Sequence, residues 1–325
     1  MQAHSEGSVG IIDVFLTLFL LGVALFIAVA PSRRAQAGGL LCLGAGLSIV
    51  WLRLGSVDVA LAEAALGGGV LSGILVRLVM ASTGNEAGQP EKRPAAAPQW
   101  LKAATGVVTG AVMVVVLGAV VLRAEQSGPA WAQAVPEATP EVGVSHGITA
   151  VLLGFRSYDT LLESAVLMFA GLVVMALNSD RPPGAREAPV SPTFGWFVTI
   201  VAPVLLLLGL WLLFVGGSDS GGAFQSGAVL AGLLILLRLA GVRLGTLDRL
   251  LVPLLVVGVV VFVVMSAVGP VAGEPWLTWV GGSPFLIVLA VEVSLTAGIT
   301  AGLYLLYRAL ENPGRRISPD EEVEQ

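Results

Sequence analysis

Apolar residues in this sequence gather in long runs, and polar residues gather between the runs. A run of roughly 20 apolar residues can cross the hydrocarbon core of a bilayer as an α-helix. A surface helix would instead repeat its apolar positions every three or four residues. The runs therefore predict an all-α, polytopic membrane protein with about nine transmembrane helices, at residues 11–30, 38–54, 57–80, 101–122, 159–177, 196–215, 224–240, 247–268 and 284–310.

Three of these runs need a comment on length or position. The runs at 38–54 and 224–240 are short, which suits tilted or partly sheltered helices. The run at 11–30 resembles a signal peptide, but its apolar part is long and Arg33 and Arg34 follow it. We therefore expect an uncleaved first helix.

The basic residues predict the orientation of the chain, because cytoplasmic loops of membrane proteins are enriched in Lys and Arg. With the N-terminus outside, nearly all of the 17 Lys and Arg residues fall at the cytoplasmic side. The exceptions are Arg53, Arg123 and Arg156. An odd number of helices then places the C-terminus in the cytoplasm.

Composition excludes several classes of protein. The chain is 56% hydrophobic and 12% charged, with a mean hydropathy of +0.90, whereas soluble domains carry about 25% charged residues. A net charge of −5 does not suggest a nucleic-acid partner. The single cysteine, Cys42, and the distant His4 and His146 predict no disulfide within the chain and no metal site. We expect a protein in contact with lipid that is not an enzyme and holds no cofactor.

Polar, proline-containing linkers divide the chain into predicted modules. Residues 82–99 should form a loose cytoplasmic loop, 125–144 an outer loop, and 178–193 a module boundary. The shorter stretch 145–155 could be a half-helix, a re-entrant piece or an interfacial turn. The modules are a three-helix one at 1–100, a two-helix one at 101–190, a four-helix one at 191–313, and an acidic cytoplasmic tail at 314–325.

The stretch at 155–163 carries charge at the head of an apolar run. Asp159 and Glu163 are four residues apart, so a helix places them on the same face. Ionisable residues within a bilayer are costly and usually serve ion or proton movement. We therefore interpret both as ion-relay groups, with Arg156 as their charge partner. The alternative is that Thr160 and Glu163 form a capping box at the start of a helix.

Two carboxylates occupy the predicted third helix. Asp58 lies near its outer end, and Glu63 lies about 8 Å further in. Only Ala, Leu and Gly flank Glu63, so the sequence favours an ion-path role over a packing role. Arg53, at the end of the preceding helix, should reach Asp58 more easily than Glu63.

Glu292 lies about 12 Å from the outer end of the last predicted helix. The same argument makes it an ion-path candidate, although Ser294 or Thr296 could satisfy it locally. His146 is expected to be solvated at the outer interface.

A glycine-rich stretch opens the seventh predicted helix, with Gly221, Gly222, Phe224 and Gln225 as its candidates for close packing or polar contact. It follows no strand and lacks the Lys-Ser/Thr pair of a phosphate-binding loop.

Three stretches resemble signatures of the Mrp-type multisubunit cation/proton antiporters. Residues 57–67 (VDVALAEAALG) are similar to the "PDVALTEAALG" signature near the C-terminal end of the large MrpA-type protein, which small proteins of membrane-bound hydrogenases share. Residues 155–163 (FRSYDTLLE) are similar to the "FRGFDTxxE" signature of the next module. Residues 221–227 (GGAFQSG) are similar to the "GGGFQGG" signature of the MrpB-type protein.

The resemblance implies a fusion of the C-terminal part of an MrpA-type protein, which is MbhD- and MbhE-like, with an MrpB-type protein, which is MbhF-like. It implies that Glu63, Asp159 and Glu163 occupy ion-pathway positions. Six residues depart from the family pattern and leave fewer polar groups around the path. They are Val57, Ala62, Gly154, Ala223, Ser226, and Glu292 in place of the more frequent Asp.

The function that the resemblance implies is that of a membrane subunit in a Na+/proton antiporter of a prokaryotic cell membrane. Its partners would be other membrane subunits of an Mrp-like complex, including large antiporter-like subunits, and its cargo would be Na+ and H+. Two alternatives remain. The chain could be the ion-path subunit of a hydrogenase-like or other redox- or solute-coupled complex, or it could be a structural scaffold that moves no ion.

Overall fold

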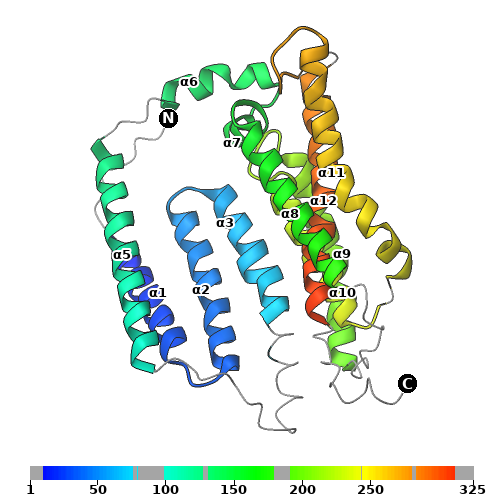
Figure 1. Ribbon diagram of the computed structural model, residues 1–325. Helices are drawn as coiled ribbons and strands as arrows, with labels where there is room; N and C mark the ends of the chain where they lie inside the picture. The colour runs from blue at the N-terminus through cyan, green and yellow to red at the C-terminus, as the bar shows by residue number, and fades with distance from the viewer. Residues whose placement is uncertain are drawn as a thin grey trace, which may run out of the picture.

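The computed structural model describes residues 10–75, 79, 99–126, 131–178, 191–242, 244–279 and 283–311. Throughout these residues the regular structure is helical (Figure 1). The helices, which include the π-helices η1 and η3 and the 3-10 helix η2, are α1 (Ile11–Val29), α2 (Arg33–Arg53), α3 (Val57–Glu63), η1 (Ala64–Val70), α5 (Gln99–Gln126), α6 (Trp131–Ala138), η2 (Thr139–Val142), α7 (Gly147–Ala150), η3 (Val151–Phe155), α8 (Ser157–Asn178), α9 (Pro192–Val215), α10 (Ala223–Leu239), α11 (Gly245–Val271) and α12 (Pro284–Glu311).

Each predicted span coincides with a helix of the described chain, so the prediction of an all-α, polytopic membrane protein is confirmed. Eight helices within the described residues are long and apolar enough to cross a membrane, and α10 is a shorter apolar helix of 17 residues. The run at 38–54 belongs to a longer helix than expected, because α2 begins at Arg33. Ser32 caps this start by accepting the Ala35 N–H on its Oγ. The sidedness of the chain stays a prediction.

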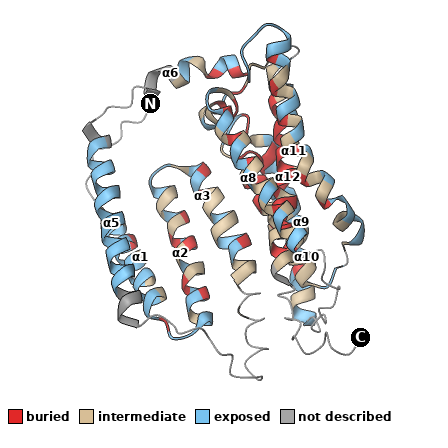
Figure 2. Cartoon of the chain, viewed as in Figure 1, coloured by how far each residue is buried: buried red, intermediate tan, exposed pale blue. Residues whose placement is uncertain are grey.

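The core of the molecule surrounds α12. This helix packs against α8, α10 and α11, and Figure 2 shows buried residues gathered there. Glycines bring the backbones close together, since a Cβ at Gly227 of α10 would lie 2.7 Å from Ile299, and one at Gly302 of α12 would lie 2.8 Å from Leu167 of α8. Close approach of small residues is how helices associate in a bilayer, where hydrophobicity alone gives no preference.

The helices α3 and η1 join the N-terminal part of the chain to this core. Both pack against α10 and α2, and Gly73, in the helical turn after η1, lies against Ile235 of α10. The π-helix η1 begins directly after Glu63, and the π-helix η3 ends one residue before Arg156. Each of these π-helical segments therefore adjoins one of the charged stretches that the sequence singles out, as π-bulges often do at functional sites.

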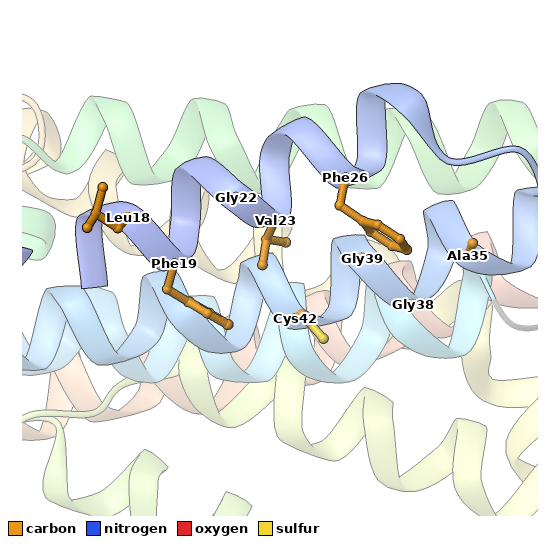
Figure 3. A pocket seen from close by; sticks show the side chains of 9 residues that line it. All are labelled: Leu18, Phe19, Gly22, Val23, Phe26, Ala35, Gly38, Gly39 and Cys42. Carbon is orange, nitrogen blue, oxygen red and sulfur yellow. The ribbon is translucent and has the colours of Figure 1, made fainter. Parts of the chain in front are cut away.

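The helices α1 and α5 form the outer part of the molecule. Every residue from Ala104 to Arg123 of α5 is exposed, and Leu16 is the buried residue of α1. A groove of about 530 Å³ runs between α1 and α2, with Gly22, Gly38 and Gly39 in its floor (Figure 3). These faces offer the apolar surface that lipid or another membrane helix covers.

The predicted outer loop at 125–144 contains ordered helix, so the expectation of an irregular linker is wrong there. The helix α6 lies across the upper end of the molecule in Figure 1 and continues into η2. Thr139 Oγ1 donates to the Val135 carbonyl, 2.6 Å away, and Gly143 ends the turn with a φ of +82°. Pro140 stands at the start of η2, where proline is tolerated, but Pro136 lies inside α6, where proline normally argues against a helix.

Of the three alternatives for residues 145–155, the structure contains a short helix, α7 followed by η3. It breaks from α8 at Arg156, whose φ is −128° and ψ is 35°. The predicted loop at 82–99 lies outside the described residues except for its last residue, and the acidic tail lies outside them entirely. Most of the boundary at 178–193 lies outside them as well.

Candidate functional site

The carboxylate of Asp58, at the start of α3, is buried and contacts three residues from other parts of the chain. It is 5% exposed. Its Oδ1 accepts the Gly221 N–H at 3.1 Å, and its Oδ2 lies 3.1 Å from both Ser220 Oγ and His146 Nε2. The side chain of Gln225 donates to the Asp58 carbonyl at 3.3 Å. Asp58 thus joins α3 to the start of α7 and to the turn between α9 and α10.

One contact in this region was not foreseen, and one expectation is wrong. Arg53 pairs with Asp13, in the first turn of α1, at 2.9 Å and 3.1 Å. Asp13 lies beside the end of α2, so its carboxylate is within reach of the Arg53 guanidinium. His146 is not solvated, since its side chain is 18% exposed and contacts Asp58. The pairing joins residues 88 positions apart, which no local pattern in the sequence could have indicated.

Glu292 of α12 is the second buried carboxylate. It is 4% exposed and accepts no hydrogen bond within the described part of the chain. It lines a cavity of about 30 Å³ together with Gly222, Gln225, Thr149 and Thr160. Room of this size suffices for a water molecule. The cavity therefore contains a buried carboxylate that receives no hydrogen bond from the described part of the protein.

Local satisfaction of Glu292 by its own helix is an expectation that the structure overturns. Ser294 Oγ donates to the Val291 carbonyl at 2.8 Å, and Thr296 Oγ1 is buried without a partner. The two threonines of the cavity donate to backbone carbonyls instead: Thr149 to Gly216 and Thr160 to Leu152. Their hydroxyl protons are thus committed elsewhere.

The glycine-rich stretch forms the turn that separates Asp58 from Glu292. A Cβ at Gly221 would lie 2.5 Å from the Leu212 carbonyl oxygen, so only glycine fits there. Gly222 has a φ of +105°, and a Cβ there would lie 3.1 Å from Glu292 Oε1. Gln225 makes the polar contact described above, and Phe224 lines the cavity and packs on the core. The glycines are therefore required by close backbone approach.

Glu63 lies apart from this group, between α2 and its own helix. Its Oε1 would be 2.5 Å from a Cβ at Gly67 and 3.5 Å from one at Gly44 of α2. The side chain therefore covers two glycines and is neither fully buried nor exposed. The structure brings it into no contact with Glu292.

The charged stretch at the start of α8 lies toward the outside. Arg156 and Asp159 form an ion pair at 2.5 Å, with side chains 69% and 44% exposed, and Glu163 is exposed. The capping-box alternative is wrong, because α8 begins at Ser157 and the Thr160 hydroxyl donates to the Leu152 carbonyl at 2.7 Å. Of this stretch, Thr160 alone lines the Glu292 cavity.

Sequence reasoning missed His146, Ser220 and Thr149 as parts of the polar region. Each acquires its place through tertiary contacts, and none has a distinctive sequence context. Among the described residues, no three His, Cys, Asp or Glu side chains gather closely enough to hold a metal ion.

The fold and these buried carboxylates define a multi-pass α-helical membrane protein with ionisable groups held among its spanning helices. Residues 18–85 match the MbhD family, a component of MBH, and residues 194–309 match a domain related to the MnhB subunit of the Na+/H+ antiporter. The chain therefore contains a segment that matches the MbhD family, followed by a domain that matches the MnhB-related family. Glu63 falls in the first match and Glu292 in the second.

The solved structure of the Mrp complex from Dietzia sp. DQ12-45-1b contains a similar chain, with a TM-score of 0.72 and 18% identity. The similarity covers 98% of this protein and 37% of that chain, so this protein spans about a third of the length of its structural relative. The comparison with curated proteins gave no match.

Proposed function

We propose that this protein is a membrane subunit of a multisubunit Na+/proton antiporter in the cell membrane of a prokaryote, and that it contributes carboxylates to the ion path. The observation that carries the proposal is the MnhB-related domain at 194–309 with an unpartnered, buried Glu292 inside it. The MbhD match and the similarity to a chain of an Mrp complex support it.

Each carboxylate would act by binding a proton and a Na+ ion in turn. An ionised carboxylate without a donor is costly in a low-dielectric interior, so Glu292 needs a bound proton or a cation to stay there. A group that must be neutralised by one or the other can pass protons and Na+ in alternation. Glu63 and Asp159 would serve the same path at other depths, with Glu163 beside Asp159, and Asp58 beside the turn. Arg156 would be the charge partner of Asp159, with which it forms an ion pair.

Other subunits would complete this path. Asp159 and Glu163 lie on an exposed side of α8, where a carboxylate of a spanning helix needs a protein or aqueous neighbour. Large antiporter-like subunits on other chains, with further membrane subunits, are the partners that we propose. We assign this chain no chemical catalysis of its own and no cofactor apart from the transported Na+ and H+.

A second candidate rests on the first family match, which is to the MbhD component of MBH. The same module could serve as the ion path of a membrane-bound hydrogenase. The subunits that co-purify in mild detergent discriminate the two: a nickel–iron hydrogenase partner supports this candidate, and antiporter-like subunits alone support the first. A scaffold that moves no ion would keep its transport complex active after every buried carboxylate is neutralised.

Neutralising Glu63 or Asp159 should reduce cation-driven proton exchange by about tenfold or more, because membrane carboxylates in ion paths are hard to replace. The measurement is Na+-driven proton movement in inverted vesicles carrying the whole complex, with the variants Glu63→Gln and Asp159→Asn. Glu141→Gln, at an exposed position of η2, is the matched control and should behave as the unmodified protein. Undiminished exchange in both variants would contradict the proposal.

A further inference from the structure

One turn of the chain lies between the two buried carboxylates. It comprises residues 219–222, between α9 and α10. On one side the Gly221 N–H donates to Asp58 Oδ1 at 3.1 Å. On the other side Gly222 packs so closely on Glu292 that a Cβ would approach Oε1 to 3.1 Å. Any movement of this turn away from Asp58 therefore changes the wall of the Glu292 cavity.

His146 holds the opposite side of the Asp58 carboxylate. Its Nε2 and the Ser220 hydroxyl lie 3.1 Å from the same oxygen, Asp58 Oδ2. The backbone N–H groups of Ser145 and His146 donate to the Gly217 carbonyl at 2.9 and 3.2 Å. The start of α7 is thus attached to the turn both through its backbone and through Asp58.

We propose that Asp58 and His146 are positioning residues for Glu292: their contact holds the 219–222 turn against the Glu292 cavity, and its loss frees the turn so that water reaches the carboxylate. This inference deepens the proposed function and rests on it. Neither residue lines the cavity. Asp58 contacts two residues that do, because its carboxylate accepts from Gly221 and its backbone carbonyl accepts from Gln225. The position of the turn depends on this contact, because three separate segments of the chain meet at the Asp58 carboxylate.

The contact joins an imidazole nitrogen of His146 to a carboxylate oxygen of Asp58, and the Ser220 hydroxyl shares that oxygen. The nearby elements carry further acidic groups: Asp219 in the turn, whose Oδ1 accepts the Ser220 N–H, Glu141 on η2 and Glu292 on α12, the first two exposed.

Hydrogen–deuterium exchange of the turn tests the inference directly. Intact complexes that carry the unmodified protein or the variant His146→Ala are exchanged under the same conditions. The peptide covering 216–226 should lose protection about tenfold in His146→Ala, as expected for one hydrogen-bonded contact. A peptide within α11, residues 251–262, serves as the internal control and should not change.

Variants separate positioning from general stability. His146→Gln keeps a side-chain donor toward Asp58, so it should retain most of the protection that His146→Ala loses at 216–226. Asp58→Asn should lose about as much protection as His146→Ala, and Ser220→Ala a smaller amount. Should Asp58→Asn fail to assemble, His146→Ala still decides. Unchanged protection of 216–226 in His146→Ala would overturn the inference.

The exchange measurement involves no transport, so it fails independently of the proposed function. A turn that loses protection in His146→Ala, in a complex that moves no Na+ or protons, overturns the antiporter proposal and the transport role of the turn. Active antiport with a turn that is unchanged in His146→Ala overturns the positioning role alone.

Discussion

The variant Glu292→Gln will lose Na+-driven proton exchange, by about a hundredfold or to the background of empty vesicles. Glutamine has the shape of the carboxylic acid but can neither release a proton nor attract a cation. Because Glu292 is 4% exposed and has no donor in the described chain, no neighbouring protein group can take over its charge. Proton movement in inverted vesicles, started by a Na+ pulse, is the measurement.

The control for this result is Glu274→Gln, at an exposed position between α11 and α12, which should transport normally. Glu292→Asp should restore part of the activity, since it keeps the carboxylate but shortens it by one methylene. Equal amounts of assembled complex must be present, as judged by the co-purified subunits. Normal exchange in Glu292→Gln would remove Glu292 from the ion path.

The second large effect concerns stability. Gly258→Ala should destabilise the assembled protein by about 1–3 kcal/mol, which is the usual cost of overpacking. A Cβ at Gly258 of α11 would lie 2.8 Å from the Ser294 carbonyl oxygen and 3.2 Å from the Leu295 Cα of α12. Both are backbone atoms, so relief requires the two helices to separate. The midpoint of thermal unfolding of the purified complex should fall.

Gly232→Ala, in α10, is the matched control, because a Cβ there meets nothing within 4 Å. It should be neutral or slightly stabilising, since alanine favours helix over glycine. If Gly258→Ala melts at the same temperature as Gly232→Ala, the close contact of α11 with α12 does not limit stability.

The spanning helices could be predicted from sequence because one property, apolar length, decides them in a bilayer. The predicted span at 284–310 and the helix Pro284–Glu311 nearly coincide. The largest error at a helix start was in α2, where a capped, arginine-bearing turn extends the helix beyond its apolar run. Hydropathy does not register such polar extensions.

The site was less accessible to sequence reasoning. The depth of Glu292 followed from its place in an apolar run, and the tight fit of Gly221 and Gly222 followed from their lack of side chains. The contact of Asp58 with His146 depends on how α3 packs on α10 and where α7 begins. Spacing along a chain predicts neighbours within one helix, not partners from three segments. For the same reason Asp13 was overlooked as the partner of Arg53.

The outward-facing α5 has a consequence for how this helix lies in the membrane. From Ala104 to Arg123 it keeps no side chain inside the fold, so its own sequence cannot specify its final tilt or rotation. We expect the tilt of α5 to depend on its lipid or protein surroundings, and probes attached to it to report those surroundings.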